Sequence, residues 1–273
     1  MTDRYAVIGH PIAHSKSPLI HGLFATATGQ DLDYTAIEAP LDGFPTTVQA
    51  FRANGGRGVN VTLPFKLQAY ELATDPMESA RLAGAANALK FDGERIWAEN
   101  FDGTGLVNDI QRNLGAALAG KRVLICGAGG ATRGALLPIA RQQPARLAIA
   151  NRTAETAHRL ARDFAGLATV HAGGYGDLQG EAFDVVINAT STGLTLDNLP
   201  LANTVFAPGA LAYDMVYGKG LTPFLKQAQA AGVTRVADGV GMLVEQAAEA
   251  FHWWRGVRPD TRAVIQKLTV PLT

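Results

Sequence analysis

A strand-like run that breaks into glycines constrains the fold of this chain more than any other feature. Residues 123–135 read VLICGAGGATRGA, in which an apolar run ends at Gly127 and is followed by Gly129 and Gly130. Glycines at this point allow a tight turn and let the backbone approach a pyrophosphate, which is favoured at the N-terminus of the next helix. The match to G-x-G-x-x-G/A is imperfect, because Thr132 occupies its last position. The strand before and the helix after still favour a nucleotide-binding loop over a structural turn.

Strand-like and helix-like segments alternate along most of the sequence. One array ends near Asn100, a second begins near Lys121, and the residues after Gly241 are helical without strands. This alternation predicts an α/β fold with mostly parallel sheets covered by helices. The stretch GTGLVNDIQRNLG, residues 103–115, is expected to connect the two arrays as a helix.

The stretch GVNVTLPFK, residues 58–66, predicts a strand that runs into a helix. Apolar and polar residues alternate through its first part, which is the period of a strand, and Pro64 suits the first turn of a helix. Asn60, Thr62 and Lys66 then lie at the edge of the sheet where α/β proteins bind ligands. On this pattern alone they are either surface residues or part of a catalytic site.

A second helix start lies in GHPIAHSKSPLIHG, residues 9–22. Ser17 stands where an N-cap belongs, and Pro18 occupies the first helical position. Ser15 and Lys16 beside them would suit a small anion such as a carboxylate. A simple capped helix needs only one serine, so the local sequence leaves both interpretations open.

The end of the strand after the glycine loop favours one cofactor. The sequence there is AIANRTAET, with no carboxylate before Glu155. An NAD site usually has an acidic residue at this point for the ribose hydroxyls. Asn151, Arg152 and Thr153 instead provide an amide, a guanidinium that can pair with a phosphate, and a hydroxyl. NADP is therefore predicted, against the alternative that Arg152 is a solvated loop residue.

Composition narrows the range of partners. Lys plus Arg and Asp plus Glu each number 24, so there is no electrostatic case for a nucleic-acid or membrane-surface partner. Hydrophobic residues make up 47% and charged residues 18%, which indicates a packed core. The six histidines form no metal-ligand motif, and no metal is expected.

Cysteine usage and hydropathy indicate a cytoplasmic protein. The single cysteine, Cys126, lies in an apolar run and is expected to be buried, and the lack of an intrachain disulfide fits a reducing compartment. The N-terminus has no signal-peptide features. No apolar run approaches the ~20 residues that span a bilayer.

Nine stretches of the sequence carry a family resemblance. They are SKSP (15–18), NVTLPFK (60–66), GAANAL (84–89), NFDGTG (100–105), GAGGATRGAL (127–136), NRT (151–153), NATSTG (188–193), YDMVYGKGLTPFL (213–225) and DGVGMLVEQAAEAF (238–251). In this order and at this spacing they resemble shikimate dehydrogenase. The resemblance implies NADPH-dependent, reversible reduction of 3-dehydroshikimate to shikimate, in the biosynthesis of aromatic amino acids.

The resemblance also implies a domain division. Residues 1–102 and 239–273 would form an α/β substrate-binding and catalytic domain, to which the C-terminal helices return. Residues 103–238 would form a Rossmann-type NADP-binding domain. A small-molecule substrate is expected, and the sequence leaves monomer and homodimer open.

Roles for individual residues follow from the same resemblance. Lys66 and Asp102 would be the catalytic pair and would also contact the substrate. The residues that would bind the substrate carboxylate or ring hydroxyls, or frame their pocket, are Ser15, Ser17, Asn60, Thr62, Asn87, Tyr217 and Gln246. The residues that would bind NADP are Gly127, Ala128, Gly129, Gly130, Ala131, Asn151, Arg152, Thr153, Thr190, Met215 and Gly239.

Some points stay open at this level. Lys66 could donate a proton or stabilise negative charge, and the sequence does not decide between the two roles. Some family members carry a second arginine after NRT, where this chain has Thr156, so its preference for NADP could be looser. Two alternatives remain: a quinate/shikimate dehydrogenase with relaxed NAD and NADP use, and a catalytically idle NADP-binding sensor.

Overall fold

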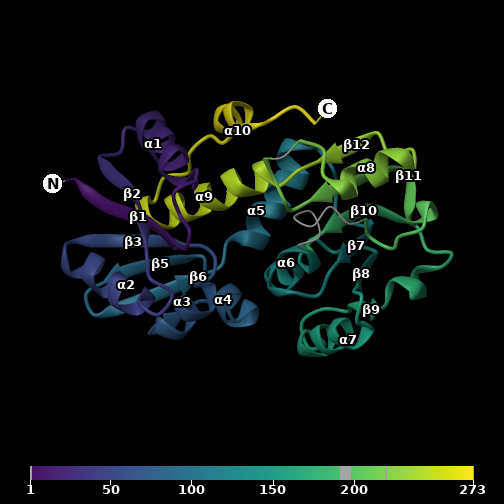
Figure 1. The fold of residues 1–273 in the computed structure, drawn as a ribbon, viewed down its shortest axis with the longest axis horizontal. Coiled ribbons are helices and arrows are strands. Elements are labelled where there is room, and N and C mark those ends of the chain that lie inside the picture. Colours follow the sequence, from purple (N-terminus) through teal and green to yellow (C-terminus); the bar gives the residue numbers. More distant parts are fainter. Residues whose placement is uncertain (1, 191–197, 219, 273) are drawn as a thin grey trace. The chain divides into compact units, whose positions relative to one another are not determined.

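The chain folds into two compact units. In the computed structural model, which describes residues 2–190, 198–218 and 220–272, one unit comprises Met1–Gly105 and Val244–Lys267 and the other comprises Leu106–Leu243 and Leu268–Thr273 (Figure 1). The chain passes from one unit to the other within α5 (Asp102–Asn108), within α9 (Val240–Arg255) and at the end of α10 (Arg262–Leu268). Residues 191–193 of NATSTG and residue 219 of YDMVYGKGLTPFL lie outside the described residues.

The first unit is built on a mixed sheet of six strands in the order β2-β1-β3-β5-β6-β4. These strands are β1 (Asp3–Gly9), β2 (Leu32–Glu38), β3 (Gly56–Val61), β4 (Asp75–Pro76), β5 (Ala88–Asp92) and β6 (Arg95–Glu99). β1 runs parallel to β2 and β3, whereas β5 runs antiparallel to both β3 and β6. The ends of β1, β3 and β6 and the start of β5 therefore meet at one edge of this sheet.

Helices cover both faces of this sheet, and the strand pattern explains why. Along β1, Ala6 and Ile8 belong to a core with α2 (Phe44–Ala53), α3 (Lys66–Leu72) and α4 (Glu78–Ala83). Tyr5 and Val7 point to the other face, where their cluster includes Trp254 of α9. Figure 1 shows α2, α3 and α4 on one side of the sheet and α1 (Ser17–Thr28) on the other. Successive residues of a strand face opposite sides of the sheet. Helices cover both sides here, so the residues on both faces of β1 are apolar.

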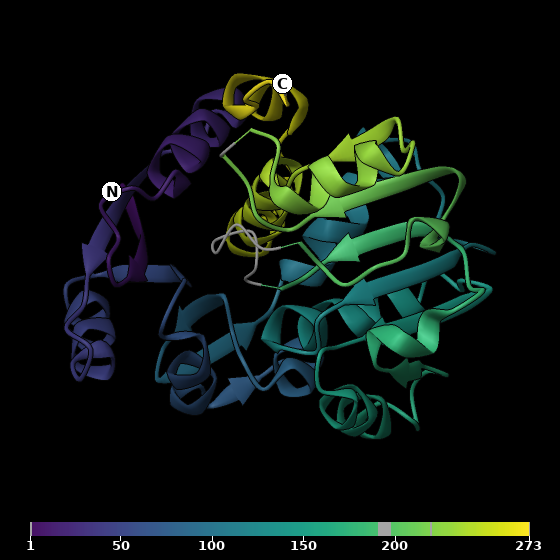
Figure 2. The same cartoon turned by 45° about the vertical axis from the view of Figure 1, so that its right-hand side comes forward.

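The second unit is built on a fully parallel sheet in the order β12-β11-β10-β7-β8-β9 (Figure 2). Its strands are β7 (Arg122–Cys126), β8 (Arg146–Ala150), β9 (His171–Gly173), β10 (Phe183–Asn188), β11 (Phe206–Asp214) and β12 (Arg235–Ala237). Counted in chain order from β7 and read across the sheet from β9, the strands have the order 3-2-1-4-5-6, which is typical of dinucleotide-binding domains. The two sheets and their helices confirm the predicted α/β class.

An α-helix follows each of three strands of the second unit. α6 (Gly130–Ala140) follows β7, α7 (Ala154–Asp163) follows β8, and α8 (Pro223–Ala230) follows β11. α8 contributes Phe224, Leu225 and Ala228 to a core that contains Cys126. The Cys126 thiol is buried as predicted, and burial raises its pKa above the ordinary value. Among the described residues, no helix is both long and apolar enough to cross a bilayer.

Two helix starts differ from the sequence predictions. α3 begins at Lys66, so Pro64 precedes the helix, because the Phe65 amide closes a turn onto the Thr62 carbonyl at 3.0 Å. α1 begins at Ser17 itself, with Lys16 at the N-cap position. The Ser17 side chain is therefore not the N-cap. The hydroxyl of Ser15 accepts from the Ser17 amide at 3.3 Å, so it provides a partner for a first-turn N–H group.

Two further helical segments were also predicted, the C-terminal helix and the helix that connects the two arrays. α10 (Arg262–Leu268) follows α9, as the helical tail of the sequence predicted. The predicted connecting helix is present as α5, which continues into a π-helical segment, Asp109–Asn113. Tyr213 donates from its hydroxyl to Asp109 at 2.7 Å, which joins this segment to the end of β11 within the second unit.

Candidate active site

A lysine and an aspartate form a close ion pair at the edge of the first sheet. Lys66 is the first residue of α3, and Asp102 is the first residue of α5, shortly after β6 ends. Lys66 Nζ lies 2.5 Å from Asp102 Oδ2, and the two side chains are 28% and 17% exposed. A charge-assisted hydrogen bond of this length is strong, and it orients both groups. The remaining exposure keeps the ammonium within reach of a small solute.

Two asparagines hold Asp102 in place. Asn87 Nδ2 donates to Asp102 Oδ1 at 2.8 Å, so the other carboxylate oxygen is left for Lys66. Asn100 Oδ1 accepts from the Asp102 amide at 3.1 Å, and its own amide group donates to the Ala85 carbonyl at 3.0 Å. Asn100 is not among the site residues predicted from the sequence. The sequence feature that could have identified Asn100 is its position two residues before Asp102. At this spacing an asparagine side chain commonly binds the backbone in a turn.

Asn87 uses both of its amide hydrogens within the chain. Besides Asp102, Asn87 Nδ2 donates to Gln246 Oε1 of α9 at 3.3 Å. The side-chain oxygen Oδ1 of Asn87 accepts from the Phe101 backbone amide at 2.9 Å. An asparagine carries two N–H donors, so Asn87 has none left for a ligand in this arrangement. Asn87 thus links Asp102 to Gln246.

Asn60 joins the same network from β3. Its Nδ2 donates to the Asn87 backbone carbonyl at 3.2 Å, and its Oδ1 accepts from the Tyr34 hydroxyl at 2.7 Å. Thr62 follows the end of β3, is half-buried, and binds the Ile8 carbonyl through its amide at 3.0 Å. The structure thus connects Lys66, Asp102, Asn87, Asn60 and Gln246 by hydrogen bonds, with Thr62 two residues from Asn60.

The two serines of SKSP lie after β1, which ends at the same edge of the first sheet. Ser17 is buried and Ser15 is half-buried. Both sit in the first turn of α1 or just before it, where backbone N–H groups lack partners inside the helix. This setting suits a carboxylate, as the sequence predicted, but the binding role itself stays a prediction.

The glycine loop of the second unit fits a pyrophosphate. Gly127 follows β7 with a φ of +103°, and a Cβ atom there would lie 2.9 Å from Thr190 Cγ2. Added Cβ atoms at Gly129 and Gly130 would meet nothing within 4 Å, so the loop backbone is open at the start of α6. Ala128 and Ala131 are half-buried. A positive φ, a close approach and an open backbone are what this ligand requires.

Thr132, at the last position of the imperfect motif, binds the glycine loop itself. This residue is fully buried, and its hydroxyl donates to the Gly127 carbonyl at 2.8 Å. The threonine thus ties the first turn of α6 back to the loop, in the place where the usual motif has a small residue for helix–strand packing.

The residues predicted for the adenosine phosphate follow β8. Asn151 donates from Nδ2 to the Thr153 carbonyl at 3.0 Å, which closes this turn before α7. Arg152 is exposed and forms no ion pair with any residue that the structure describes. An exposed guanidinium just after β8 is free to bind a phosphate.

The residues predicted for the nicotinamide half follow β10, β11 and β12. Thr190 comes after β10 and donates from its amide and hydroxyl to Asn188 Oδ1, at 3.0 and 2.6 Å. Met215 follows β11, and Gly239 follows β12. A Cβ atom at Gly239 would lie 2.3 Å from the Met215 carbonyl oxygen, so only glycine fits this contact. Tyr217, predicted to bind substrate, belongs to the second unit and is 43% exposed.

A buried aspartate organises the ends of β10 and β11. Asp214 accepts from Thr222 Oγ1 at 2.5 Å, from Asn188 Nδ2 at 3.2 Å and from the Val216 amide at 3.1 Å. The carboxyl is fully buried, and burial raises its pKa, while these hydrogen bonds act in the opposite direction. Asn188 in turn binds Thr190, so Asp214 lies beneath the residues predicted to contact the cofactor.

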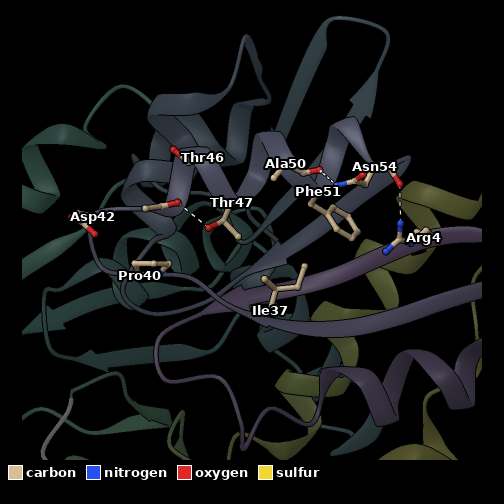
Figure 3. Close-up of a pocket in the computed structure, with 10 residues that line it drawn as sticks. Arg4, Ile37, Pro40, Asp42, Thr46, Thr47, Ala50, Phe51 and Asn54 are labelled. Carbon is tan, nitrogen blue, oxygen red and sulfur yellow. Dashed lines mark hydrogen bonds between the residues drawn. The ribbon is translucent and has the colours of Figure 1, made fainter.

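An open pocket elsewhere on the first unit contains none of the predicted residues (Figure 3). Its lining is Arg4, Ile37, Pro40, Asp42, Gly43, Thr46, Thr47, Ala50, Phe51 and Asn54. Three of its polar side chains already bind the backbone: Thr47 binds Gly43, Asn54 binds Ala50, and Arg4 binds Asn54. Nothing in this arrangement suggests a reaction.

The fold and the two groups of residues define a class of protein, a nucleotide-dependent α/β enzyme with a lysine–aspartate pair and a Rossmann-type sheet. Three family models match the chain. They are the shikimate dehydrogenase substrate binding domain over residues 7–89, shikimate / quinate 5-dehydrogenase over 109–201, and the shikimate 5'-dehydrogenase C-terminal domain over 239–269.

Individual relatives agree with these models. A protein of Nitrosospira multiformis named shikimate dehydrogenase (NADP(+)) is 56% identical over 98% of each chain. The crystal structure of an Ael1 enzyme from Pseudomonas putida is 59% identical, covers 100% of both chains and has a TM-score of 0.97. Shikimate 5-dehydrogenase from Thermus thermophilus, solved with NADP(H) and shikimate, is 31% identical over 97% of this chain and 98% of its own, with a TM-score of 0.86. The chain belongs to the shikimate dehydrogenase family.

Proposed function

We propose that this chain is an NADP-dependent shikimate dehydrogenase, which reversibly reduces 3-dehydroshikimate to shikimate in the biosynthesis of aromatic amino acids. The observation that carries this proposal is the Lys66–Asp102 pair, held by Asn87 in a chain 56% identical to an enzyme of that name. A catalytically idle sensor would have no need of such a pair.

Lys66 acts on the oxygen of the reacting group. NADPH, when bound, supplies a hydride to the ketone carbon of the substrate. Negative charge then develops on the ketone oxygen, and a nearby ammonium can stabilise that charge or donate a proton. Asp102 orients the ammonium through the 2.5 Å contact. Asn87 and Asn100 fix the direction of Asp102.

The first unit provides most of the proposed substrate contacts. Ser15 and Ser17 would bind the carboxylate, and Asn60, Thr62 and Gln246 would bind or frame the ring hydroxyls. Support comes from the hydrogen-bonded chain that links Asn60 and Gln246 to the catalytic pair through Asn87. Tyr217 of the second unit remains a proposed contact as well.

The second unit would hold the cofactor along the carboxyl ends of its strands. The loop from Gly127 to Ala131 would take the pyrophosphate, and Asn151, Arg152 and Thr153 would take the adenosine phosphate. Thr190, Met215 and Gly239 would lie along the nicotinamide half. Support comes from the open glycine backbone and from the exposed Arg152.

The domain division and the compartment belong to the same proposal. Residues 1–102 and 239–273 would serve the substrate, and residues 103–238 would serve NADP. We place the reaction in the cytoplasm, because the single cysteine is buried and unpaired, as is typical of a reducing compartment. Neither a nucleic acid nor a membrane is needed by this function, and a homodimer is compatible with it.

A steady-state assay of the purified protein tests this function. Initial rates would be measured with shikimate or quinate as substrate and NADP+ or NAD+ as cofactor. We expect a strong preference for shikimate with NADP+. Equal turnover of quinate with NAD+ would support the broader quinate/shikimate dehydrogenase instead. Binding of NADP+ without turnover of either substrate would support the idle sensor.

A further inference from the structure

A buried tyrosine outside the predicted site contacts one of its central residues. Tyr34 lies in β2, next to Tyr5 in the parallel ladder with β1, and it is buried among apolar side chains. Its hydroxyl donates to Asn60 Oδ1 at 2.7 Å, and the two residues are 26 positions apart in the sequence. The motifs that identify the substrate site do not include Tyr34.

The direction of this hydrogen bond is fixed by a backbone carbonyl. Asn60 Nδ2 faces the Asn87 carbonyl at 3.2 Å. If the amide were flipped, two acceptor oxygens would face each other there, which is unfavourable. Asn60 Oδ1 must therefore face Tyr34, and the phenol must be the donor. One Nδ2 hydrogen of Asn60 then remains for a ligand, so Asn60 offers a donor to an acceptor oxygen of the substrate.

The ring of Tyr34 is itself held in position. His21 of α1 stacks on it with ring centroids 4.1 Å apart and an angle of 5° between the planes. His21 is fully buried, and burial lowers its pKa to about 3, against a weaker opposite effect of Asn60. The imidazole is thus neutral at ordinary pH and packs as an aromatic ring. Ser17 also acts on the Tyr34 hydroxyl, lowering its pKa against the larger effect of burial.

We propose that Tyr34 is a positioning residue for substrate recognition, which fixes the amide of Asn60 so that it presents an N–H group to a hydroxyl oxygen of the substrate. This inference rests on the proposed function, in which Asn60 contacts the substrate. Without the phenolic hydroxyl, Asn60 Oδ1 loses this donor, and the amide is held less firmly, by the Asn87 carbonyl on its Nδ2 side. Recognition of the substrate then weakens, whereas the cofactor site on the second unit is unaffected.

The test compares Tyr34→Phe with Tyr5→Phe. Both changes remove one buried hydroxyl from the same cluster on adjacent strands, but only Tyr34 contacts Asn60. We expect Tyr34→Phe to raise the KM for shikimate about tenfold, the effect of one buried hydrogen bond. The KM for NADP+ should stay as in the wild type, and Tyr5→Phe should change neither value. If the two variants have the same KM for shikimate, the proposal is wrong.

A double-mutant cycle then asks whether Tyr34 acts through Asn60. In an Asn60→Ala background, Tyr34→Phe should have little further effect on kcat/KM for shikimate, because its partner is already absent. Full additivity would overturn the proposal and leave Tyr34 a general structural residue. Wild-type turnover of shikimate is measured in the same experiment. Its absence would contradict the proposed function itself, whereas a normal wild type with a normal Tyr34→Phe variant would contradict only this inference.

Discussion

The two candidate sites are built from different parts of the chain. In the first unit, the Lys66–Asp102 pair is held by side chains that bind other side chains, as in Lys66 to Asp102 and Asn87 to Gln246. In the second unit, the loop after β7 offers glycine backbone with open space around it. Arg152, beside that loop, is exposed.

This difference matches the ligands that the two sites would bind. A pyrophosphate is the same in every dinucleotide, and backbone N–H groups at a helix start recognise it without side chains. A small hydroxylated acid is distinguished from its analogues only by the placement of individual donors and acceptors. Single side-chain substitutions should therefore have large effects in the first unit. In the second unit the effects should be large only where a side chain, such as Arg152, binds one particular group of the cofactor.

The largest effect is expected for Lys66→Ala. Removal of the ammonium leaves the charge that develops on the ketone oxygen without a partner, so kcat should fall about 10²–10⁴-fold. KM for shikimate should change little, because the proposed contacts to the ring and the carboxylate remain. Steady-state kinetics with shikimate and NADP+ measure both values.

Lys90→Ala is the matched control for this substitution. Lys90 is another half-buried lysine of the first unit, and its Nζ donates to the Trp253 carbonyl at 3.2 Å. Its loss should leave kcat near the wild-type value. An unchanged kcat in Lys66→Ala would remove Lys66 from the chemistry, and an equal fall in both variants would indicate damage to the unit as a whole.

The structure agrees best with the sequence where the signal is local. Gly127 is identified by a strand, a turn and a helix within a short stretch, and its positive φ agrees with that prediction. The α/β class follows from alternation along the chain. The start of α3 is less well predicted, because Pro64 fits a first helical turn by propensity, whereas the turn closed by Phe65 and Thr62 delays the helix to Lys66.

Contacts between distant residues could not be read in the same way. Asn87 and Gln246 are 159 positions apart, and the motifs in which they occur say nothing of their hydrogen bond. Tyr34 is missed for the same reason, since it lies on β2 and its partner Asn60 lies on β3. Side-chain networks depend on how strands pair, and that register comes from the tertiary structure.

A smaller effect is expected for Arg152→Ala. If this guanidinium binds the 2′-phosphate, its loss should raise the KM for NADP+ about 10–100-fold, as for a charge-assisted pair. The KM for NAD+ should change much less, because that cofactor lacks the phosphate. Arg159→Ala, at another exposed position in the adjoining helix α7, is the control and should affect neither cofactor. Equal losses for both cofactors in Arg152→Ala would contradict the phosphate role and leave the second site built from backbone alone.

The smallest effect concerns Asp214, which supports the second site without lying in it. Asp214 accepts one hydrogen bond from the Thr222 hydroxyl and two from N–H groups. In Asp214→Asn, the amide NH2 group replaces one of the two acceptor oxygens and must face at least one of these donors. The free energy of unfolding should therefore fall by about 1–3 kcal/mol. Urea unfolding followed by circular dichroism measures the change.

The pH dependence of this loss identifies its origin. Because burial raises the pKa of Asp214, the folded chain holds this proton more tightly than the unfolded chain does. The resulting stabilisation is present below the unfolded pKa, about 3.9, and is lost as the pH rises through the raised folded value. The asparagine cannot titrate, so the difference in stability between wild type and Asp214→Asn should be larger at pH 4, near the unfolded pKa, than at pH 8. A difference that grew with pH would mean that the carboxylate is stabilised by its hydrogen bonds more than it is destabilised by burial. The second unit would then contain a charged network comparable to the one around Asp102.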